Sequence, residues 1–421
     1  MGILVSLFVI LLLPSIPCMI LLSLYLRLTK NKNSVAFFHP YCNAGGGGER
    51  VLWCAINGMQ ERLRWLLEAS NYPRFTMILQ TLAAYYVGME ALLKFNPEIL
   101  IDTMGYPFVL PLFKWIGGCK VGCYVHYPTI STDMISMVEN RESSYNNAEW
   151  ISKSTFLSFG KLIYYKLFAL FYKFCGFAAD VVMVNGTWTE GHINTLWNRK
   201  AKKIFPPCNV DEFINLKNIS EDIFENEKIV QILSVGQIRP EKNHKLQLEA
   251  FAKAKNMLGD VKLKLIIVGG CRNEDDIERY EKLKDYGAKL SIADDVIWKI
   301  NCPFDILLEF MSTSLIGIHT MINEHFGISV VEQMAAENIM ISNNSGGPMM
   351  DIIVDKHPLK NAKGFLATSA DEYASAIISI IKLSKLERDV IRKEAKKQSE
   401  IFSDKAFDEK WYDSMKSLMG E

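Results

Sequence analysis

The sequence predicts an α/β protein with two domains, each built on a parallel β-sheet. The chain has 421 residues, which exceeds the size at which one hydrophobic core stops growing. Short apolar runs typical of buried strands alternate with longer stretches that have helical apolar spacing. Glycine-rich turns follow two of these runs, where the loops of open α/β sheets bind ligands.

Composition argues against nucleic acid as a partner. Lys and Arg together number 47, Asp and Glu together also number 47, and the formal net charge at pH 7 is zero. A neutral chain without a basic run lacks the electrostatic footprint of a phosphate-backbone groove. The nine cysteines show no C-x-x-C pairs of a zinc site, and we expect them to be reduced thiols.

Residues 1–29 are expected to form a transmembrane anchor. Gly2–Leu26 is an uncharged, mostly apolar stretch, long enough to cross ~30 Å of hydrocarbon at ~1.5 Å per residue. Arg27, Lys30 and Lys32 follow it, and positive charge on this side alone orients the downstream chain toward the cytosol. A cleaved signal peptide is the alternative, but a basic n-region and a small-residue cleavage site are missing.

The first domain is expected over residues 30–220. A strand at residues 34–38 leads to the four glycines Gly45, Gly46, Gly47 and Gly48, and a helix follows from Glu49. A glycine loop at a helix start lets the backbone approach a ligand closely. It matches neither the G-x-G-x-x-G fingerprint nor a Walker A loop. A flexible linker is the alternative interpretation.

Further strands of this domain are expected at residues 77–79, 99–102, 121–126 and 178–184. Asp102 and His126 end two of them. Ligands of open α/β folds bind at the carboxyl edge of the sheet, so both residues are candidates for a site. A structural histidine with satisfied hydrogen bonds is the alternative for His126.

An aromatic helix is expected over residues 156–177. Lys166 and Lys173 share one face of this helix. The opposite face carries the aromatic residues Tyr164, Tyr165, Phe168, Phe171 and Tyr172. This helix either lies on a bilayer surface or covers the sheet, and periodicity does not distinguish lipid from protein.

The second domain is expected over residues 221–401, after a polar linker at residues 209–228. Its strands are expected at residues 229–236, 263–270, 296–300, 315–319 and 339–342. Arg239 and Lys242 follow the first of them, a suitable position for cations that hold a diphosphate. A final helix, within residues 402–421, is expected to pack back on the first domain.

The central motif of the second domain is Glu324–Glu332, with two glutamates in an E-x7-E pattern. A loop is expected to run into a helix here, which leaves the backbone N–H groups of Phe326, Gly327 and Ile328 free to bind an anion. The carboxylates of Glu324 and Glu332 accept hydrogen bonds from hydroxyls. The motif therefore predicts a nucleotide-sugar site.

Four stretches together resemble the GT-B retaining glycosyltransferases and, more closely, the GDP-mannose-dependent α-1,2-mannosyltransferases of asparagine-linked glycosylation. These stretches read HPYCNAGGGGERVLWCA, HYPTISTDM, VGQIRPEKNH and NEHFGISVVEQMAA. The resemblance extends over essentially the whole chain and implies two Rossmann-like domains facing a cleft. It also implies transfer of the fourth and fifth mannoses from GDP-mannose to a dolichol-diphosphate-linked oligosaccharide. The expected location is the cytosolic face of the endoplasmic reticulum membrane, beside other transferases of the pathway.

The resemblance also implies roles for individual residues. Glu324 matches the acid that contacts the donor sugar, Glu332 the acid on the nucleotide ribose, and Lys242 the lysine of the diphosphate clamp. The superfamily usually has Arg directly after the strand glycine, where this chain has Gln237, and Arg239 follows two residues later. We expect Glu324, Lys242 and His126 to be catalytic and Arg239 to bind the donor.

The sequence contains no Asp-x-Asp motif, so we expect no essential metal and no cofactor, with cations and amides in place of Mg²⁺ at the phosphates. Glycosidase chemistry is disfavoured because two helical turns separate the glutamates more widely than one scissile bond requires.

Two alternatives remain open at this stage. One is another retaining glycosyltransferase that uses a lipid carrier with a different donor or linkage. The other is a non-catalytic membrane scaffold.

Overall fold

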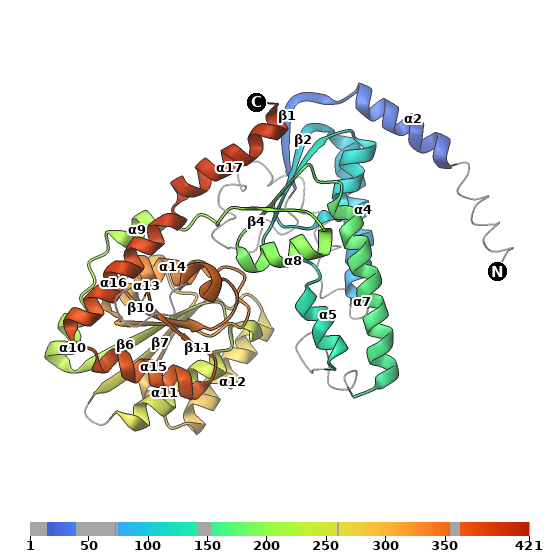
Figure 1. The fold of residues 1–421 in the computed structure, drawn as a ribbon. Coiled ribbons are helices and arrows are strands. Elements are labelled where there is room, and N and C mark those ends of the chain that lie inside the picture. Colours follow the sequence, from blue (N-terminus) through green and yellow to red (C-terminus); the bar gives the residue numbers. More distant parts are fainter. Residues whose placement is uncertain are drawn as a thin grey trace. The chain divides into compact units, whose positions relative to one another are not determined.

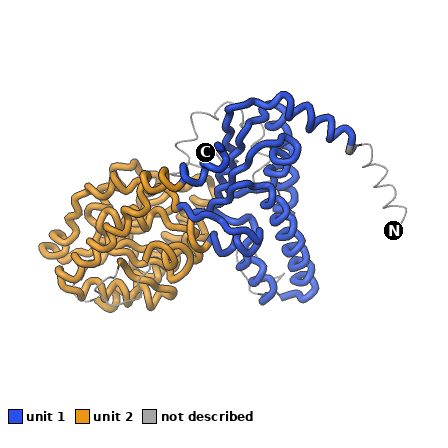
Figure 2. Tube along the Cα trace, turned by 45° about the horizontal axis from the view of Figure 1, so that its top comes forward, with its two compact units in different colours: residues 1–185, 189–204, 411–421 blue, residues 186–188, 205–410 orange. Residues whose placement is uncertain are grey.

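The computed structural model describes residues 15–38, 72, 75–141, 153–258, 261–353 and 363–420. The chain forms two compact units, which Figure 2 distinguishes by colour. The first contains residues 1–185, 189–204 and 411–421, and the second contains residues 186–188 and 205–410. The division therefore lies earlier in the chain than the expected boundary after residue 220.

The first unit is built on a parallel sheet with the strand order β1-β2-β3-β4-β5. The strands are β1 (Asn31–Phe38), β2 (Pro97–Asp102), β3 (Lys120–Val125), β4 (Val181–Val184) and β5 (Lys202–Lys203). Nearly every residue of β2, β3 and β4 is buried, as expected for parallel strands covered by helices on both faces.

The α-helices of this unit are labelled in Figure 1. Its helices are α2 (Ser15–Leu28), α4 (Thr76–Lys94), η4 (Pro107–Val109), η5 (Leu112–Ile116), α5 (Thr132–Glu139), α7 (Thr155–Gly176) and α8 (Thr187–Trp197). The strand expected at residues 77–79 is wrong, because these residues lie inside α4. A short apolar run does not distinguish a strand from a segment of a buried helix.

The aromatic face of α7 packs against protein. Tyr165, Phe168 and Tyr172 are buried, and the ring of Phe108 from η4 stacks on Phe171 with the centroids 5.7 Å apart. The face that aromatic spacing singled out therefore covers the core of the first unit. Other large apolar side chains of α7 are exposed, namely Phe156, Leu157, Phe159, Ile163, Leu167, Leu170 and Phe174.

The expected anchor is described only from Ser15, as α2. Its C-terminal end is held by the first unit: the Ser23 hydroxyl donates to the Ile116 carbonyl (2.9 Å) and the Asn96 amide to the Leu26 carbonyl (2.8 Å). Among the described residues, α4 is the helix with sufficient length and apolarity to cross a membrane, a property that core helices of soluble proteins share. A membrane span within residues 1–29 stays a prediction.

The second unit is built on a parallel sheet with the strand order β11-β10-β9-β6-β7-β8. The strands are β6 (Ile229–Val235), β7 (Lys262–Gly269), β8 (Val296–Ile300), β9 (Ile316–His319), β10 (Ile339–Asn343) and β11 (Phe365–Ala367). From β6 the sheet continues through β7 to β8 on one side, and from β9 it continues through β10 to β11 on the other side. The boundary between β6 and β9 is therefore a topological switch point, where open α/β sheets bind ligands.

Helices surround this second sheet (Figure 1). They are α9 (Val210–Ile214), α10 (Ser220–Glu227), η6 (Pro240–Lys242), α11 (His244–Met257), α12 (Glu274–Lys289), η7 (Ala293–Asp295), α13 (Phe304–Thr313), α14 (Ile328–Ala335), η8 (Pro348–Ile352), α15 (Ala370–Lys382), α16 (Lys385–Ser399), η9 (Glu400–Phe402) and α17 (Asp404–Met419). Capping boxes begin α15 and α16, where Ser369 pairs with Glu372 and Ser384 with Glu387, which stabilises both helix starts. In the first unit, the end of α17 buries Met415 and Leu418.

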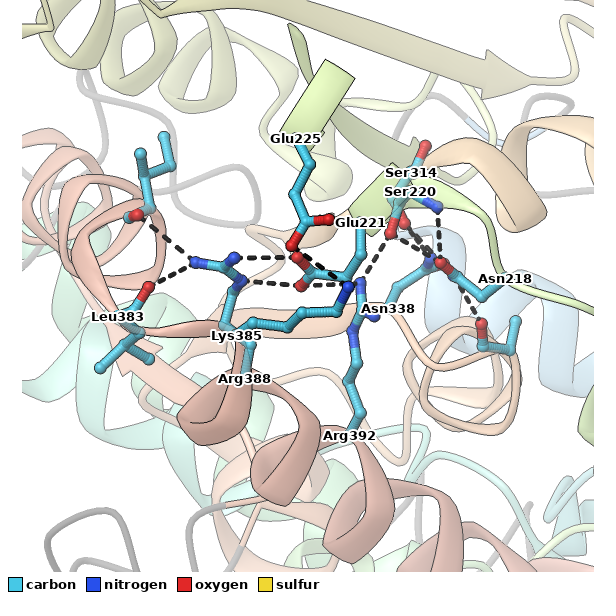
Figure 3. Close-up of polar contacts among 12 residues, drawn as sticks. Asn218, Ser220, Glu221, Glu225, Ser314, Asn338, Leu383, Lys385, Arg388 and Arg392 are labelled. Carbon is cyan, nitrogen blue, oxygen red and sulfur yellow. Dashed lines mark hydrogen bonds and ion pairs between the residues drawn. The ribbon is translucent and has the colours of Figure 1, made fainter. Parts of the chain in front are cut away.

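The segment expected to be a polar linker contains α9 and α10 and supplies a buried ion cluster (Figure 3). Glu221 of α10 accepts two hydrogen bonds from the Arg388 guanidinium of α16, at 2.7 and 2.8 Å. Arg392 lies 3.6 Å from the same carboxylate and donates to the Ser220 hydroxyl (2.6 Å). The linker interpretation is wrong for these residues, because charges that looked solvated are buried against arginines distant in the sequence.

Candidate active site

The carboxyl ends of three adjacent strands, β6, β9 and β10, carry the candidate residues of the second unit. Gly236 follows β6, and the chain continues through η6 to Lys242. Glu324 lies in the loop between β9 and α14, and the Ser345–Pro348 turn follows β10. Because neighbouring parallel strands end at one edge, residues far apart in the sequence meet at the switch point.

Lys242 and Glu324 form an ion pair at this edge. Lys242 Nζ lies 2.5 Å from Glu324 Oε2, and the side chains are 23% and 12% exposed. The same ammonium lies 3.2 Å from the sulfur of Met321. The structure therefore brings together two of the three residues that the sequence predicts to be catalytic.

Glu324 is an ionised carboxylate in a largely buried position. His319, the last residue of β9, places Nε2 3.1 Å from Glu324 Oε2. Burial alone would favour the neutral acid, but the hydrogen bond from His319 and the charges of Lys242, His319 and His325 outweigh it and hold the pKa of Glu324 well below its usual range. Glu324 therefore remains a hydrogen-bond acceptor throughout the physiological pH range.

Backbone carbonyls on both sides of the pair are held by buried hydroxyls. The Thr320 hydroxyl donates to the Lys242 carbonyl (2.8 Å) and accepts from the Gln247 amide of α11 (3.0 Å). The Tyr373 hydroxyl of α15 donates to the His319 carbonyl (2.9 Å). These bonds fix the start of α11 relative to the end of β9, and thereby the positions of Lys242 and Glu324.

The second glycine turn supports the loop that carries Glu324. The Gly347 N–H donates to the Glu324 carbonyl (2.7 Å) and the Ser345 hydroxyl accepts from the Asn323 N–H (2.8 Å). Gly346 has φ +58°, and a Cβ there would lie 2.3 Å from the Glu324 carbonyl oxygen. No side chain fits at Gly346, so the glycine is required by the close approach of the two loops.

The start of α14 presents free backbone N–H groups. Gly327 is the N-cap residue, with φ +113°. In the part of the chain that the structure describes, the N–H groups of Phe326, Gly327 and Ile328 donate no hydrogen bond. The Phe326 ring packs against Phe402, with centroids 5.2 Å apart, which holds the residue that carries the first of these N–H groups. These groups meet the requirements of an anion site at a helix N-terminus.

Glu332 lies further along α14 and is mostly buried. It makes no hydrogen bond or ion pair with any described residue. Burial, together with the charge of Glu212, raises the pKa of Glu332 to about 7. A half-buried carboxylate without described partners has capacity to accept hydrogen bonds from a bound ligand.

Arg239 and His126 make contacts with residues other than Lys242 and Glu324. Arg239 Nη1 lies 3.7 Å from Glu241, and its Nε has no partner among the described residues. Burial, followed by the charge of Arg272, lowers the pKa of Arg239. His126 follows β3 in the first unit, and its ring meets Tyr124 edge-on at 4.8 Å.

The glycine loop Gly45–Gly48 lies outside the described residues. Asp102 ends β2 of the first unit and accepts from the Gly105 and Tyr106 N–H groups, at 2.7 and 3.0 Å. Burial raises the pKa of Asp102 to about 6, although these bonds and the Cys123 thiol oppose the shift. The described residues contain no group of three or more His, Cys, Asp or Glu side chains that could hold a metal ion, and metal independence stays a prediction.

Sequence reasoning did not identify His319, Thr320, Gln247 or Tyr373. A signal for His319 was available, since it ends an apolar run just as Asp102 and His126 do. The other three act through bonds between elements far apart in the sequence, and these bonds leave no local pattern.

Comparison with known proteins identifies the family. The family profile "ALG11 mannosyltransferase N-terminus" matches residues 32–65 and 59–197, and "Glycosyl transferases group 1" matches residues 216–398. A GDP-Man:Man(3)GlcNAc(2)-PP-Dol alpha-1,2-mannosyltransferase of Caenorhabditis elegans is 43% identical over 94% of this chain and 94% of that protein. The protein of the same name from Homo sapiens is 44% identical over 92% of this chain and 88% of its own.

Solved structures agree with the fold. A glycosyltransferase from Rickettsia africae superposes with a TM-score of 0.56 at 18% identity and covers 83% of both chains. Anabaena Alr3699/HepE in complex with UDP and glucose superposes with a TM-score of 0.58 at 16% identity, over 82% of this chain and 84% of its own. The chain therefore belongs to the ALG11 mannosyltransferase family and is a glycosyltransferase with the GT-B fold.

Proposed function

We propose that this protein transfers mannose, with retention of the anomeric configuration, from GDP-mannose to a dolichol-diphosphate-linked oligosaccharide. The transfers form α-1,2 linkages and add the fourth and fifth mannoses of the N-glycan precursor. The names of the relatives support the donor and the acceptor. The observation that carries the proposal is the Lys242–Glu324 pair beside the free N–H groups of α14, at the switch point of the second sheet.

In this proposal the second unit binds the donor. The diphosphate binds to Lys242, to Arg239 and to the N–H groups of Phe326, Gly327 and Ile328, because a lysine, an arginine and a helix N-terminus are each complementary to phosphate charge. Glu332 accepts hydrogen bonds from the ribose hydroxyls. Its lack of described partners and its half-buried position support this role.

Departure of the diphosphate is the step that requires stabilisation. Negative charge accumulates on the leaving phosphate as the glycosidic bond breaks, and preorganised cations and amides stabilise that charge without reorganisation. Glu324, held ionised, accepts hydrogen bonds from mannose hydroxyls and orients the sugar. The acceptor hydroxyl attacks from the face that the diphosphate leaves, and we assign His126 and the Gly45–Gly48 loop of the first unit to the acceptor side.

The reaction is proposed to be independent of metal ions, because Lys242, Arg239 and the α14 amides supply the positive charge at the phosphates. Transfer measured after treatment with EDTA is expected to equal transfer in added Mg²⁺. A loss of activity that only a divalent ion restores would contradict this part of the proposal.

The protein is proposed to lie on the cytosolic face of the endoplasmic reticulum membrane, with α4 and α7 against the lipid. α4 exposes Ile78, Leu82, Tyr86 and Leu93. These residues and the exposed face of α7 belong to neighbouring helices, since the Tyr85 and Phe171 rings lie 6.4 Å apart. Scattered apolar residues are normal on a surface, but exposed apolar residues that repeat every three or four positions along one helix, as in α7, mark a protein or membrane contact.

The chain has N-x-S/T glycosylation sequons at Asn185, Asn218 and Asn343, and their surroundings are consistent with a cytosolic location. Asn185 and Asn343 are buried, and the Asn218 side-chain amide donates to the carbonyls of Met311, Ser314 and Ala336. None of these amides is accessible to a glycan in the folded chain.

Nucleotide-dependent thermal protection tests the donor assignment. The full-length protein in detergent is heated with GDP, with UDP or without nucleotide, because a ligand stabilises the state that binds it. We expect GDP to raise Tm and UDP to leave it unchanged. Lys242→Met should lose the protection, whereas the control Lys245→Met, at an exposed lysine that is the second residue of α11, should keep it. Equal protection by GDP and UDP would contradict the donor assignment.

A further inference from the structure

A short segment after β4 belongs to the second unit. The chain on either side of it forms part of the first unit, but Gly186, Thr187 and Trp188 belong to the second. Within that unit Thr187 bonds to Asp351 and Trp188 stacks on His325. These three residues therefore pack on the loop that carries Glu324.

Asp351 fixes this segment through both oxygens of its carboxylate. Oδ2 accepts a hydrogen bond from the N–H of Thr187, the first residue of α8 (2.8 Å), and Oδ1 accepts from the Thr187 hydroxyl. Asp351 lies in η8, directly after the second glycine turn, and is 6% exposed. A carboxylate that satisfies a free N–H group at a helix start also complements the helix dipole there, so Asp351 fixes where α8 begins.

Trp188 stacks on the residue that follows Glu324. Its ring centroid lies 5.3 Å from that of His325, and the two planes differ by 29°. Trp188 is 7% exposed. Offset stacking of flat rings is a favourable arrangement with a defined geometry, so the buried Trp188 ring restricts where His325 lies.

The backbone of His325 and Phe326 is enclosed by two glycines. A Cβ at Gly186 would lie 3.2 Å from the His325 carbonyl oxygen, and a Cβ at Gly347 would lie 2.5 Å from Phe326 Cα. The close approach on both sides leaves little room for this backbone to move. The stretch between Glu324 and α14 is therefore held by the segment after β4 as well as by the second glycine turn.

The same backbone carries the hydrogen-bond donors of the candidate anion site. The His325 N–H donates to Glu324 Oε1 (3.2 Å). The N–H groups of Phe326, Gly327 and Ile328 donate no hydrogen bond to any described residue. Amides whose position is fixed before a ligand binds stabilise its charge without reorganisation, so whatever holds His325 and Phe326 also prepares the site.

We propose that Trp188 and Asp351 are positioning residues of the donor site. Asp351 fixes the start of α8, which places Trp188, and Trp188 holds His325 so that the N–H groups that follow it face the phosphate that carries the sugar. The inference rests on the proposed function, in which those N–H groups bind the donor diphosphate. Both side chains act through the backbone of His325 and Phe326, and neither touches the donor.

The ratio of the dissociation constants for GMP and GDP tests this role. Full-length protein in detergent is titrated with each nucleotide in a calorimeter. GDP differs from GMP by the phosphate that the amides bind, so the ratio reports on the binding of that phosphate. We expect wild-type protein to bind GDP at least ~10-fold more tightly than GMP, because hydrogen bonds to a charged group are strong.

Substitutions of the two positioning residues should lower this ratio. We expect a fall of at least ~3-fold for Trp188→Ala, because the amides are no longer held in place. Trp188→Phe keeps a flat ring for His325 and should restore most of the ratio. Asp351→Ala should lower the ratio as well, whereas Asp351→Asn should retain most of it, since its side-chain amide still bonds to the Thr187 N–H and hydroxyl.

Trp197→Phe is the control for a general loss of stability. Trp197 lies in the same helix, α8, but is buried in the core of the first unit, with its ring 5.3 Å from Tyr172. The substitution should lower Tm and leave the ratio unchanged, because a smaller folded fraction weakens the apparent binding of both nucleotides alike.

The outcomes separate this inference from the proposed function. A wild-type ratio in folded Trp188→Ala or in folded Asp351→Ala would refute the positioning role and leave the donor assignment intact. An equal fall in the ratio for Trp197→Phe would also refute the positioning role. A folded wild type that binds neither nucleotide, or that binds GDP no more tightly than GMP, would refute the proposed donor site and this role with it.

Discussion

At the scale of residues, two half-buried glutamates of the same motif have opposite electrostatic environments. Glu324 has Lys242 and His319 within 3.1 Å, and its pKa lies below the usual range. Glu332 has no described partner, and its pKa is raised to about 7. The ionised form of Glu324 is stabilised by protein side chains, and we expect the ionised form of Glu332 to be stabilised by a bound ligand.

This difference predicts how stability depends on pH at Glu332. A carboxyl whose pKa rises from 4.5 to about 7 on folding binds its proton more tightly in the folded state. The free energy of unfolding therefore falls as pH rises between these values and stays low above them. Glu332→Gln removes the effect, so the variant should be more stable than wild type at pH 8 by up to ~3 kcal/mol.

At pH 5 the two proteins should differ by less than ~1 kcal/mol, because the unfolded carboxyl is then partly protonated as well. Urea denaturation at both pH values measures the difference. A variant that is less stable than wild type at pH 8 would show that Glu332 is stabilised within the free protein.

At the scale of elements, the second glycine turn determines where the loop of Glu324 lies. A Cβ at Gly346 would lie 2.3 Å from the Glu324 carbonyl oxygen, whereas a Cβ at Gly160 in α7 would meet no atom within 4 Å. Gly346→Ala must displace the Glu324 loop, and a misplacement of ~1 Å costs roughly 10²-fold in rate.

Gly160→Ala is the matched control and should stabilise α7 by ~0.5–1 kcal/mol without changing activity. Steady-state transfer rates and thermal unfolding of both variants measure these effects. Full activity of folded Gly346→Ala would contradict the supporting role of the turn.

The buried ion cluster of α10 and α16 gives a second prediction for the elements. Glu221→Gln leaves Arg388 and Arg392 buried without a carboxylate, so it should lower the free energy of unfolding by ~3–5 kcal/mol. Glu225→Gln is the control, because the Glu225–Lys385 pair is 50% and 47% exposed and such pairs contribute ~0–1 kcal/mol. Equal effects of the two substitutions on urea denaturation would contradict the structural role of the cluster.

The sequence predicted helices and strands correctly where their pattern of apolar residues is local to the segment. Continuous apolar runs predicted β2, β3, β6 and β9 to within a few residues, because buried parallel strands have that pattern. The strand expected inside α4 was wrong for the same reason, since a helix covered on one side contains similar runs. The linker was misread because Glu221 is paired with Arg388, 167 residues away.

The candidate site was predictable in part. Lys242 and Glu324 were singled out by motif, but their ion pair spans 82 residues and follows from strand order, which the sequence does not display. His319 required knowledge of which strand end lies beside which loop. For Arg239, His126 and the glycine loop, the proposed roles rest on their positions after strands or at a helix start, and they stay predictions.

At the scale of the whole molecule, the exposed apolar face of α4 and α7 predicts membrane binding that does not depend on the start of the chain. A chain lacking residues 1–14 keeps α2 and every described residue, and we expect it to float with phosphatidylcholine–phosphatidylserine vesicles. Leu167→Glu with Leu170→Glu, at side chains 62% and 65% exposed, should weaken binding at least ~10-fold, since each buried leucine contributes ~1.5–3 kcal/mol.

Leu386→Glu is the control, because this leucine of α16 is 78% exposed but belongs to the second unit. It should float as the parent does. α4 and α7 do not form the membrane-binding face if the shortened chain stays with the soluble fraction. The same conclusion holds if Leu386→Glu reduces flotation as much as the Leu167→Glu, Leu170→Glu double variant does.

The most direct test of the central claim is mannose transfer by the full-length protein. Purified protein is incubated with GDP-mannose and dolichol-diphosphate-linked Man(3)GlcNAc(2), and the released glycan is analysed by mass and by α-1,2-specific mannosidase digestion. We predict a product with two additional mannoses, both removable by that enzyme, and a rate lower by ~10²–10³-fold for Glu324→Gln. No transfer by folded wild-type protein, or equal transfer by folded Glu324→Gln, would contradict the assignment of this site.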